Sequence, residues 1–142
     1  MSFISEELPN QITLELPWPP SVNHYKKVGG LIRTTNGRLY QQRTNTDATK
    51  KFYFDVYVKS KMVMGLEWVK SSRSTTIAYE IYVYLYPPNK RRYDLDNGLK
   101  VLLDGLVRAH VINDDSQITR LTVEKCPMIP QGQVTVIIRE IL

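Results

Sequence analysis

The segment over residues 76–86 (TIAYEIYVYLY) constrains the fold of this chain more than any other. It is dense in β-branched and aromatic residues, which are typical of strands. Alternate positions are apolar and would line one face of a sheet: Ile77, Tyr79, Ile81, Val83 and Leu85. Pro87 and Pro88 end the strand, because proline has no backbone N–H to donate to a neighbouring strand. The sequence therefore predicts a strand whose exit leads directly into a charged segment.

Three other segments have the pattern of strands. Ile12–Leu16 alternates apolar and polar residues and is stopped by Pro17. Near the end of the chain, Ile118–Lys125 and Val134–Ile141 are joined by a loop rich in proline and glycine. We expect these last two strands to pair with each other as a hairpin.

Two segments are predicted to be helical. From Asp47 to Met64 the pattern suits a helix or a strand, and Asp47 as an N-cap favours the helix. The second helix runs from about Asp96 to Ala109, where leucines recur at helical spacing. Residues 65–74 are expected to form a connection. Residues 28–47 are either a long loop or a short hairpin around Asn36-Gly37, a strong turn dipeptide, and they carry Arg33, Arg38 and Arg43.

The length and composition limit the class of protein. At 142 residues the chain can bury the core of one domain. We expect a single α+β domain over residues 1–142, with a mixed or mainly antiparallel sheet and two helices. The net charge of +5 favours a polyanionic partner. The single cysteine, Cys126, leaves no intrachain disulfide, and no apolar run approaches the ~18 residues of a membrane helix, so we expect a cytoplasmic protein.

Residues 90–115 concentrate the side chains that can carry chemistry. Five carboxylates lie in this segment, and four of them form two close pairs: Asp94 with Asp96, and Asp114 with Asp115. Mg²⁺ takes oxygen ligands and is commonly held by one or two carboxylates together with substrate phosphates. The three basic residues just before them would hold a phosphate backbone against such a cluster: Lys90, Arg91 and Arg92. This combination predicts a metal site that faces a nucleic-acid backbone.

Each of these residues also has an ordinary structural interpretation. In extended backbone Asp94 and Asp96 would point to the same side and share an ion. Alternatively they cap the following helix, although one aspartate is enough for a cap. Lys100 either forms a surface ion pair with Asp96 or Asp104, or contacts the scissile phosphate. Asp114-Asp115 in isolation would be turn residues.

The spacing between the two acidic pairs limits how they can meet. A helix over residues 96–109 carries the chain roughly 20 Å away. Six extended residues recover at most about 20 Å. Asp115 can therefore barely return to Asp94 and Asp96 within one protomer. Either the helix ends earlier, or the site is completed across a dimer, and the sequence leaves both alternatives open.

The segment LPWPPSVNHYKK follows the first predicted strand. Taken alone, it is either a proline-fixed turn or a loop that places aromatic and basic side chains against a nucleic acid. In the second interpretation the DNA contacts come from Asn23, Tyr25, Lys26 and Lys27.

The chain resembles the RusA-type Holliday-junction resolvases, which are small homodimeric, Mg²⁺-dependent endonucleases found largely in phage and prophage contexts. The resemblance rests on LPWPPSVNHY, RRYDLDNGLKVLLDGL, VINDDSQI and a closing pair of strands, and it covers most of the chain. It implies a RusA-like fold in which Asp94, Asp96 and Asp115 bind the metal and Lys100 is the catalytic lysine. Asn97 and Asp114 match two further positions of the family's motifs. The family's first motif also favours DNA contact by Asn23, Tyr25 and the neighbouring lysines.

The activity implied by this resemblance is metal-assisted hydrolysis of DNA with Mg²⁺, for which Mn²⁺ can substitute. A homodimer would make paired nicks across a four-way junction during recombination and repair. We then expect the protein to associate with the bacterial nucleoid through DNA. Two other functions stay open: a non-catalytic protein that binds branched DNA, and a nuclease that acts on forks or flaps. Gly98 and residues 108–110 depart from the commonest pattern of the family.

Overall fold

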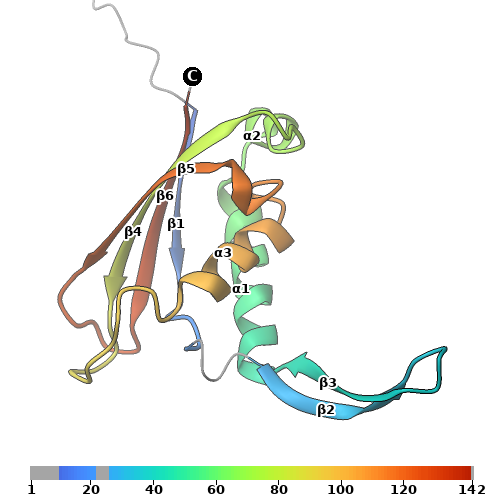
Figure 1. Cartoon of the computed structure of the whole chain (residues 1–142). Coiled ribbons are helices and arrows are strands. Elements are labelled where there is room, and N and C mark those ends of the chain that lie inside the picture. Colours follow the sequence, from blue (N-terminus) through green and yellow to red (C-terminus); the bar gives the residue numbers. More distant parts are fainter. Residues whose placement is uncertain (1–9, 22–25, 142) are drawn as a thin grey trace, which may run out of the picture.

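The computed structural model describes residues 10–21 and 26–141. The elements in chain order are β1 (Gln11–Leu16), β2 (Lys26–Arg33), β3 (Leu39–Asn45), α1 (Asp47–Val63), α2 (Leu66–Ser71), β4 (Ala78–Tyr86), α3 (Leu99–Arg108), the 3₁₀ turn η1 (Asp115–Gln117), β5 (Ile118–Lys125) and β6 (Gln133–Ile141) (Figure 1). This arrangement confirms the α+β class. In the described part of the chain, no helix has the length and apolar character needed to cross a membrane.

The main sheet is mixed and has the strand order β1-β6-β4-β5. β6 is antiparallel to both β1 and β4, whereas β5 is parallel to β4. The predicted hairpin between the last two strands is therefore wrong, because β4 lies between β5 and β6. The connection after β5 instead wraps around the end of β4, where Cys126 N donates to Leu85 O and Ile129 N donates to Pro87 O.

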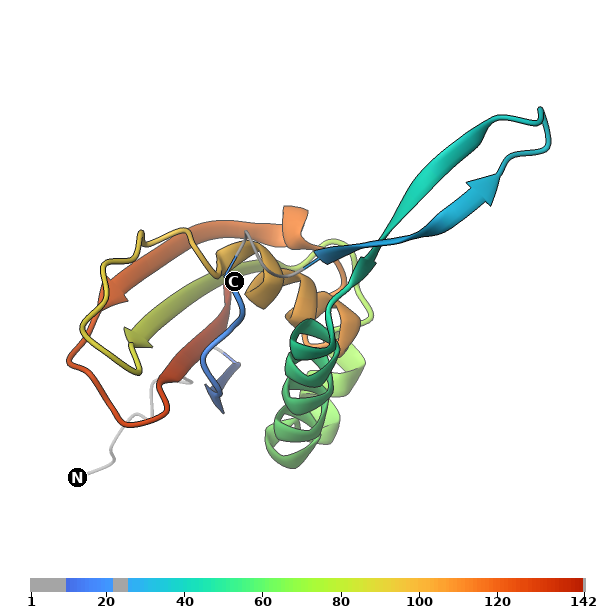
Figure 2. The same cartoon turned by 90° about the horizontal axis from the view of Figure 1, so that it is seen from below.

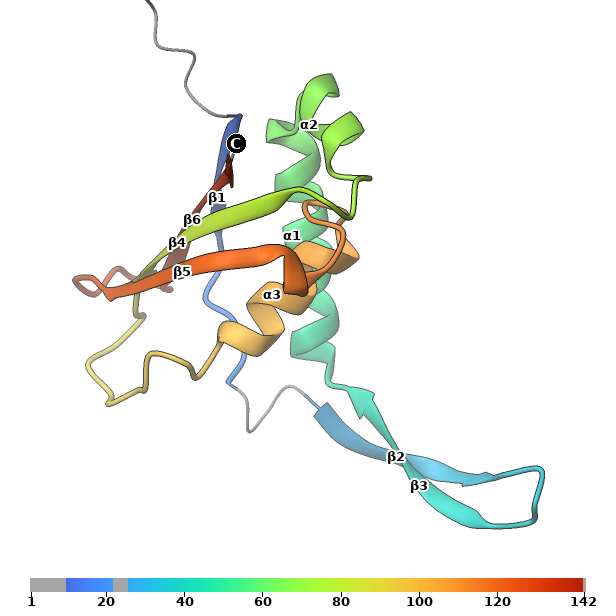
Figure 3. The ribbon, with the colours of Figure 1, turned by 45° about the horizontal axis from the view of Figure 1, so that its top comes forward.

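One face of the sheet is covered by α1 and α3, and the core lies between these two layers (Figure 3). Alternate residues of the inner strands are buried there, including Ile81 and Val83 of β4 and Val136 of β6. Trp68 of α2 closes one end of the core, and its Nε1 donates to Val111 O over 2.9 Å. β5, at the edge of the sheet, is mostly exposed.

The helices differ from the predicted ones at their ends. Thr46, not Asp47, is the N-cap of α1, and its hydroxyl accepts a hydrogen bond from Thr49 N over 3.3 Å. Phe52 and Val56 are buried on the inner side of α1, which confirms the helix over the strand alternative. α2 lies within the predicted connection, so the described part of the chain has three α-helices rather than two. α3 starts at Leu99, three residues later than predicted.

Residues 26–45 form a separate two-stranded sheet, which confirms the hairpin alternative. Its turn lies at Asn36-Gly37, where Gly37 has a φ of 78° and its N–H donates to Thr34 O over 2.9 Å. The hairpin leaves the body of the protein beside the start of α1 and projects away from both layers (Figures 1 and 2). We call this hairpin the arm.

The open face of the sheet contains a buried carboxylate, Glu80, whose exposed fraction is 3%. Tyr82 donates its hydroxyl to Glu80 over 2.6 Å, and Arg139 and Arg120 also donate to this carboxylate. These hydrogen bonds, with that of Tyr82 the largest contribution, lower the pKa of Glu80 to about 2. Because the folded-state pKa lies below the ordinary value, Glu80 stabilises the fold above the unfolded-state pKa of about 4.5.

We expect Glu80→Gln to lower the free energy of unfolding at pH 7, because Arg120 and Arg139 would lose their common charged partner. The wild type should lose this advantage as the pH falls from about 4.5 to about 2, where the Glu80 carboxylate takes up its proton. Urea unfolding of both proteins at several pH values measures the difference. A difference that stays constant down to pH 2 would contradict the assignment.

Candidate active site

The loop over residues 87–98 carries the first acidic pair and is held in place from two sides. Trp18, just after β1, meets the ring of Tyr93 edge-on at a centroid distance of 5.3 Å. Lys125, at the end of β5, donates from Nζ to Tyr93 O over 2.7 Å. Pro19 is buried and covers Gly98. The proline-rich segment after β1 therefore supports the acidic loop.

Asp94 and Asp96 are exposed on this loop. The backbone between them is not extended, which is the conformation in which their side chains would point to the same side. It turns, with Asn97 N donating to Asp94 O and Leu99 N donating to Asp96 O, each over 3.1 Å. The N-cap of α3 is Gly98, which makes no side-chain cap, so the two aspartates do not serve the capping role considered above. Within the described residues neither carboxylate has a hydrogen bond or ion pair, and both are available to a ligand.

Lys100 lies in the first turn of α3, just beyond Asp96. Its Nζ is 3.9 Å from a carboxylate oxygen of Asp104, which confirms one of the predicted i,i+4 pairs. The Lys100 side chain is still 62% exposed. Its ammonium group is thus on the surface near the acidic loop, where it can also reach a bound phosphate.

The second acidic pair is divided between two roles. Asp114 is the N-cap of η1, and it accepts hydrogen bonds from the backbone and the hydroxyl of Ser116, which lower the pKa of Asp114. Gln117 accepts from Asp114 N over 2.9 Å and donates to Ser74 O and Ile77 O. These contacts fix the turn. They leave Asp115 exposed, without a side-chain partner among the described residues.

The two acidic pairs lie at opposite ends of the sheet. Asp94 follows Tyr93, which Lys125 contacts at the end of β5, whereas Asp115 begins η1, the turn that leads directly into the start of β5. The eight residues of β5 span roughly 25 Å. Consistently, no three His, Cys, Asp or Glu side chains in residues 10–21 and 26–141 are close enough together to hold one metal ion. The late start of α3 does not bring Asp115 to the first pair.

The other residues predicted to contact DNA are mostly exposed. Lys90, Arg91 and Arg92 lie in the loop just before Asp94. Lys26 and Lys27 begin the arm, and the Lys27 ammonium is 4.0 Å from Asp47. Asn23 and Tyr25 lie outside the residues that the structure describes. Asn97 is half-buried and lines a small cavity together with Trp18 and Asp94.

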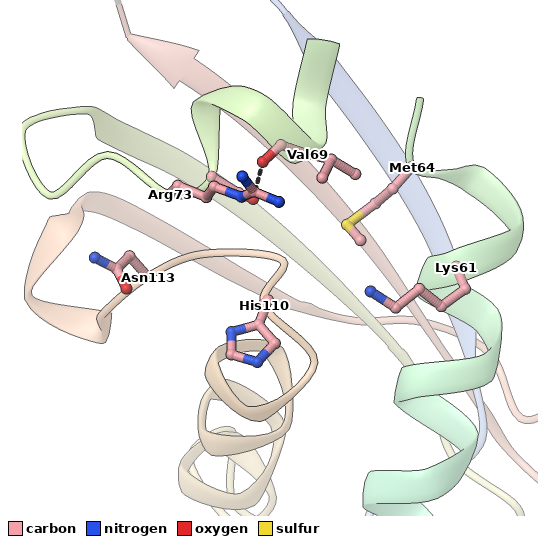
Figure 4. A pocket seen from close by; sticks show the side chains of 7 residues that line it. Lys61, Met64, Val69, Arg73, His110 and Asn113 are labelled. Carbon is pink, nitrogen blue, oxygen red and sulfur yellow. Dashed lines mark hydrogen bonds between the residues drawn. The ribbon is translucent and has the colours of Figure 1, made fainter. Parts of the chain in front are cut away.

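A cationic pocket of about 450 Å³ was not predicted (Figure 4). Three basic side chains from different elements line it: Lys61, Arg73 and His110. None of the described residues that line the pocket is acidic, and Asn113, two residues before Asp115, is part of its wall. His110 has a φ of 58°, a conformation that residues other than glycine seldom adopt. Its three basic residues come from separate segments of the chain, so no local sequence pattern indicated this pocket.

Gly98 is expected to be essential for the position of the acidic loop. A Cβ atom on Gly98 would lie 2.5 Å from Cγ of Pro19, whose rigid ring cannot turn aside. We expect Gly98→Ala to lower the free energy of unfolding by about 1–3 kcal/mol, the usual cost of overpacking. Urea unfolding measures this change. Gly65→Ala is the matched control, since a Cβ there meets nothing within 4 Å. Equal stability of the two variants would contradict this close contact.

Comparison with known proteins identifies related sequences over nearly the whole chain. The family model described as endodeoxyribonuclease RusA matches residues 17–139. The crossover junction endodeoxyribonuclease of Enterobacteria phage HK97 is 28% identical over 134 residues, which are 93% of this chain and 97% of the relative. The protein of the same name from Escherichia coli K12 is 30% identical over 135 residues, covering 92% of this chain and 96% of the relative. The matched region contains both acidic pairs and Lys100.

Proposed function

Because this chain belongs to the RusA family of endodeoxyribonucleases, we propose that it is a Mg²⁺-dependent crossover junction endodeoxyribonuclease that cuts four-way DNA junctions. The observation that carries the proposal is the pair of exposed, unpartnered carboxylates, Asp94 and Asp96, on a loop that the fold holds in place. Exposed carboxylates beside basic residues repel DNA phosphates unless a cation neutralises them, so this pair favours a metal-dependent enzyme over a protein that only binds DNA. The enzyme would act in the cytoplasm, at the nucleoid.

The donor set fits a hard divalent cation. Asp94, Asp96 and Asp115 offer charged oxygen atoms with no competing partner among the described residues, and this is the chemistry that Mg²⁺ selects, with Mn²⁺ as a substitute. When bound, the ion polarises the phosphate and lowers the pKa of a water molecule. Lys100 would place its ammonium group beside the charge that develops on the phosphate. Lys90, Arg91 and Arg92 would hold the backbone on the approach to Asp94.

We propose that the three carboxylates meet across a homodimer. β5 is an edge strand of the sheet and is mostly exposed, so its outer backbone groups can pair with another strand. Antiparallel pairing of two β5 strands about a two-fold axis brings the end of one beside the start of the other. Asp94 and Asp96 of one protomer then lie near Asp115 of the partner subunit. With Thr122 on the axis, Arg120 faces Glu124 of the partner subunit, an attractive cross-strand pair.

The cationic pocket supports the same assignment. Lys61, Arg73 and His110 can donate to a phosphate group, and Asn113 links their pocket to the turn that presents Asp115. Within the described residues, Arg73 and His110 have no ion-pair partner. We assign the pocket to a phosphate of the DNA strand that flanks the cleaved bond.

The test is cleavage of a synthetic four-way junction, compared with linear duplex of the same sequence, in Mg²⁺ and in EDTA. Paired nicks on the junction alone, and only with the metal, are the expected result. If the protein cuts forks or flaps in preference to the junction, the assigned substrate is wrong and the nuclease assignment stands. Tight binding of the junction without cleavage in Mg²⁺ or Mn²⁺ would contradict the nuclease assignment and identify a protein that only binds branched DNA.

A further inference from the structure

The arm, residues 26–45, meets the remainder of the described protein where β3 contacts α1, and Figure 2 shows it extending well beyond the helices and the main sheet. A two-stranded hairpin with both faces in water is marginally stable on its own. Several large apolar side chains on the arm are also exposed: Val28, Leu31, Leu39 and Tyr40. These features indicate a segment that is covered when a partner binds.

The charge of the arm identifies the chemistry of that partner. Its residues include five cations and no carboxylate: Lys26, Lys27, Arg33, Arg38 and Arg43. Lys27 is paired at its base with Asp47, but the three arginines are exposed and make no ion pair among the described residues. A second copy of the arm would bring like charges together, which costs energy. A polyanion is the complementary partner.

The register of the two strands gathers cations on one face. Arg33 lies opposite Leu39, and Arg43 lies opposite Val28. Residues opposite each other in an antiparallel pair, and residues two apart in a strand, point to the same side. Lys26, Arg33 and Arg43 therefore share a face with Leu31 and Leu39. Eight residues of β2 extend this face over roughly 25 Å.

We propose that the arm is a DNA-binding β-ribbon that holds a duplex arm of the substrate outside the cutting site. This inference rests on DNA being the substrate, as proposed above. A two-stranded β-ribbon has a width that the major groove of DNA admits. Arginines suit phosphate contacts because their planar guanidinium groups donate two hydrogen bonds at once. The arm thereby adds affinity for DNA at a distance from the carboxylates that we propose bind the metal.

The salt dependence of junction binding tests the arm. We expect the triple variant Arg33→Gln, Arg38→Gln, Arg43→Gln to bind a four-way junction with a shallower slope of log K against log salt. The slope should fall by roughly 2.7 for each arm in contact, since each phosphate contact contributes about 0.9. Fluorescence anisotropy between about 50 and 200 mM salt, without divalent metal, measures it. The matched control removes three exposed charges from α1 instead: Lys50→Gln, Lys51→Gln and Lys59→Gln.

The possible results test the DNA-binding arm and the nuclease assignment separately. Equal slopes for the triple variant and the wild type would overturn the DNA-binding arm, and so would a slope change as large in the α1 control. If sedimentation without DNA shows that the triple variant has lost the dimer, the arm binds a second copy of the chain. This result would also contradict the DNA-binding arm. When the triple variant is present at a concentration that saturates the junction, it should still cut with Mg²⁺ at the wild-type single-turnover rate. If the wild type itself fails to cut, the enzyme assignment fails while the slopes still decide the arm.

Discussion

The Asp96→Asn protein should bind a four-way junction as tightly as the wild type and cut it at least about a thousand-fold more slowly. The loss follows from removing one charged ligand, because metal stabilisation of the transition state amounts to several kcal/mol and each 1.36 kcal/mol is a factor of ten. The turn should survive, since Asp96 contributes to it through its backbone carbonyl, which accepts from Leu99 N. Asparagine keeps the shape of the side chain, removes its charge and replaces one acceptor oxygen with an NH₂ donor.

Single-turnover cleavage in Mg²⁺ and anisotropy in EDTA measure the two properties separately. Glu67→Gln is the matched control, because it removes one carboxylate from α2, where the Glu67 side chain is 84% exposed and pairs only weakly with Lys70 at 3.9 Å. This control should cut at the wild-type rate. Cleavage by Asp96→Asn at that same rate would show that the first acidic pair is structural. A parallel loss of binding and cleavage would indicate misfolding of the loop instead.

Mixed dimers of Asp96→Asn and Asp115→Asn should recover nicking that neither variant has alone. If Asp96 of one protomer works with Asp115 of the partner subunit, a mixed dimer has one site with both changes and one site with neither. Random assortment gives about half mixed dimers, and one of the two sites in each is intact, so about one quarter of all sites in the mixture are intact. Because the intact site has no working counterpart, the product should be a single nick rather than a resolved junction.

The matched control mixes Asp96→Asn with Asp94→Asn, two changes within the same acidic pair. Every site in that mixture lacks one carboxylate of the pair, whichever way the protomers assemble, so no nicking should return. Two affinity tags on co-expressed chains allow the mixed dimers to be purified and assayed. If purified Asp96→Asn/Asp115→Asn dimers stay inactive, the carboxylates do not meet across the β5 edges, and each site belongs to one protomer.

Local sequence was sufficient for features that depend on neighbours along the chain. The alternation in residues 78–86 determined β4, and Asn36-Gly37 determined the turn of the arm. The i,i+4 spacing of Lys100 and Asp104 anticipated their ion pair. The acidic residues themselves were also evident, because carboxylates so concentrated beside cations are chemically unusual. Strand period, turn chemistry and helical spacing all act over a few residues, and they can be recognised without knowing the fold.

Features that depend on distant segments required the tertiary structure. The alternation in Ile118–Lys125 does not reveal that β4 lies between this strand and β6. The order of strands depends on which distant segments pair with each edge of β4. The proline-rich segment after β1 looked like a turn, yet Trp18 and Pro19 support the acidic loop through contacts with Tyr93 and Gly98. Sequence spacing left open whether Asp115 reaches the first acidic pair, and the parallel β4–β5 pairing placed them at opposite ends of the sheet. The local sequence was thus enough to select the side chains that we propose carry the chemistry, and long-range strand pairing decided how far apart the fold holds them.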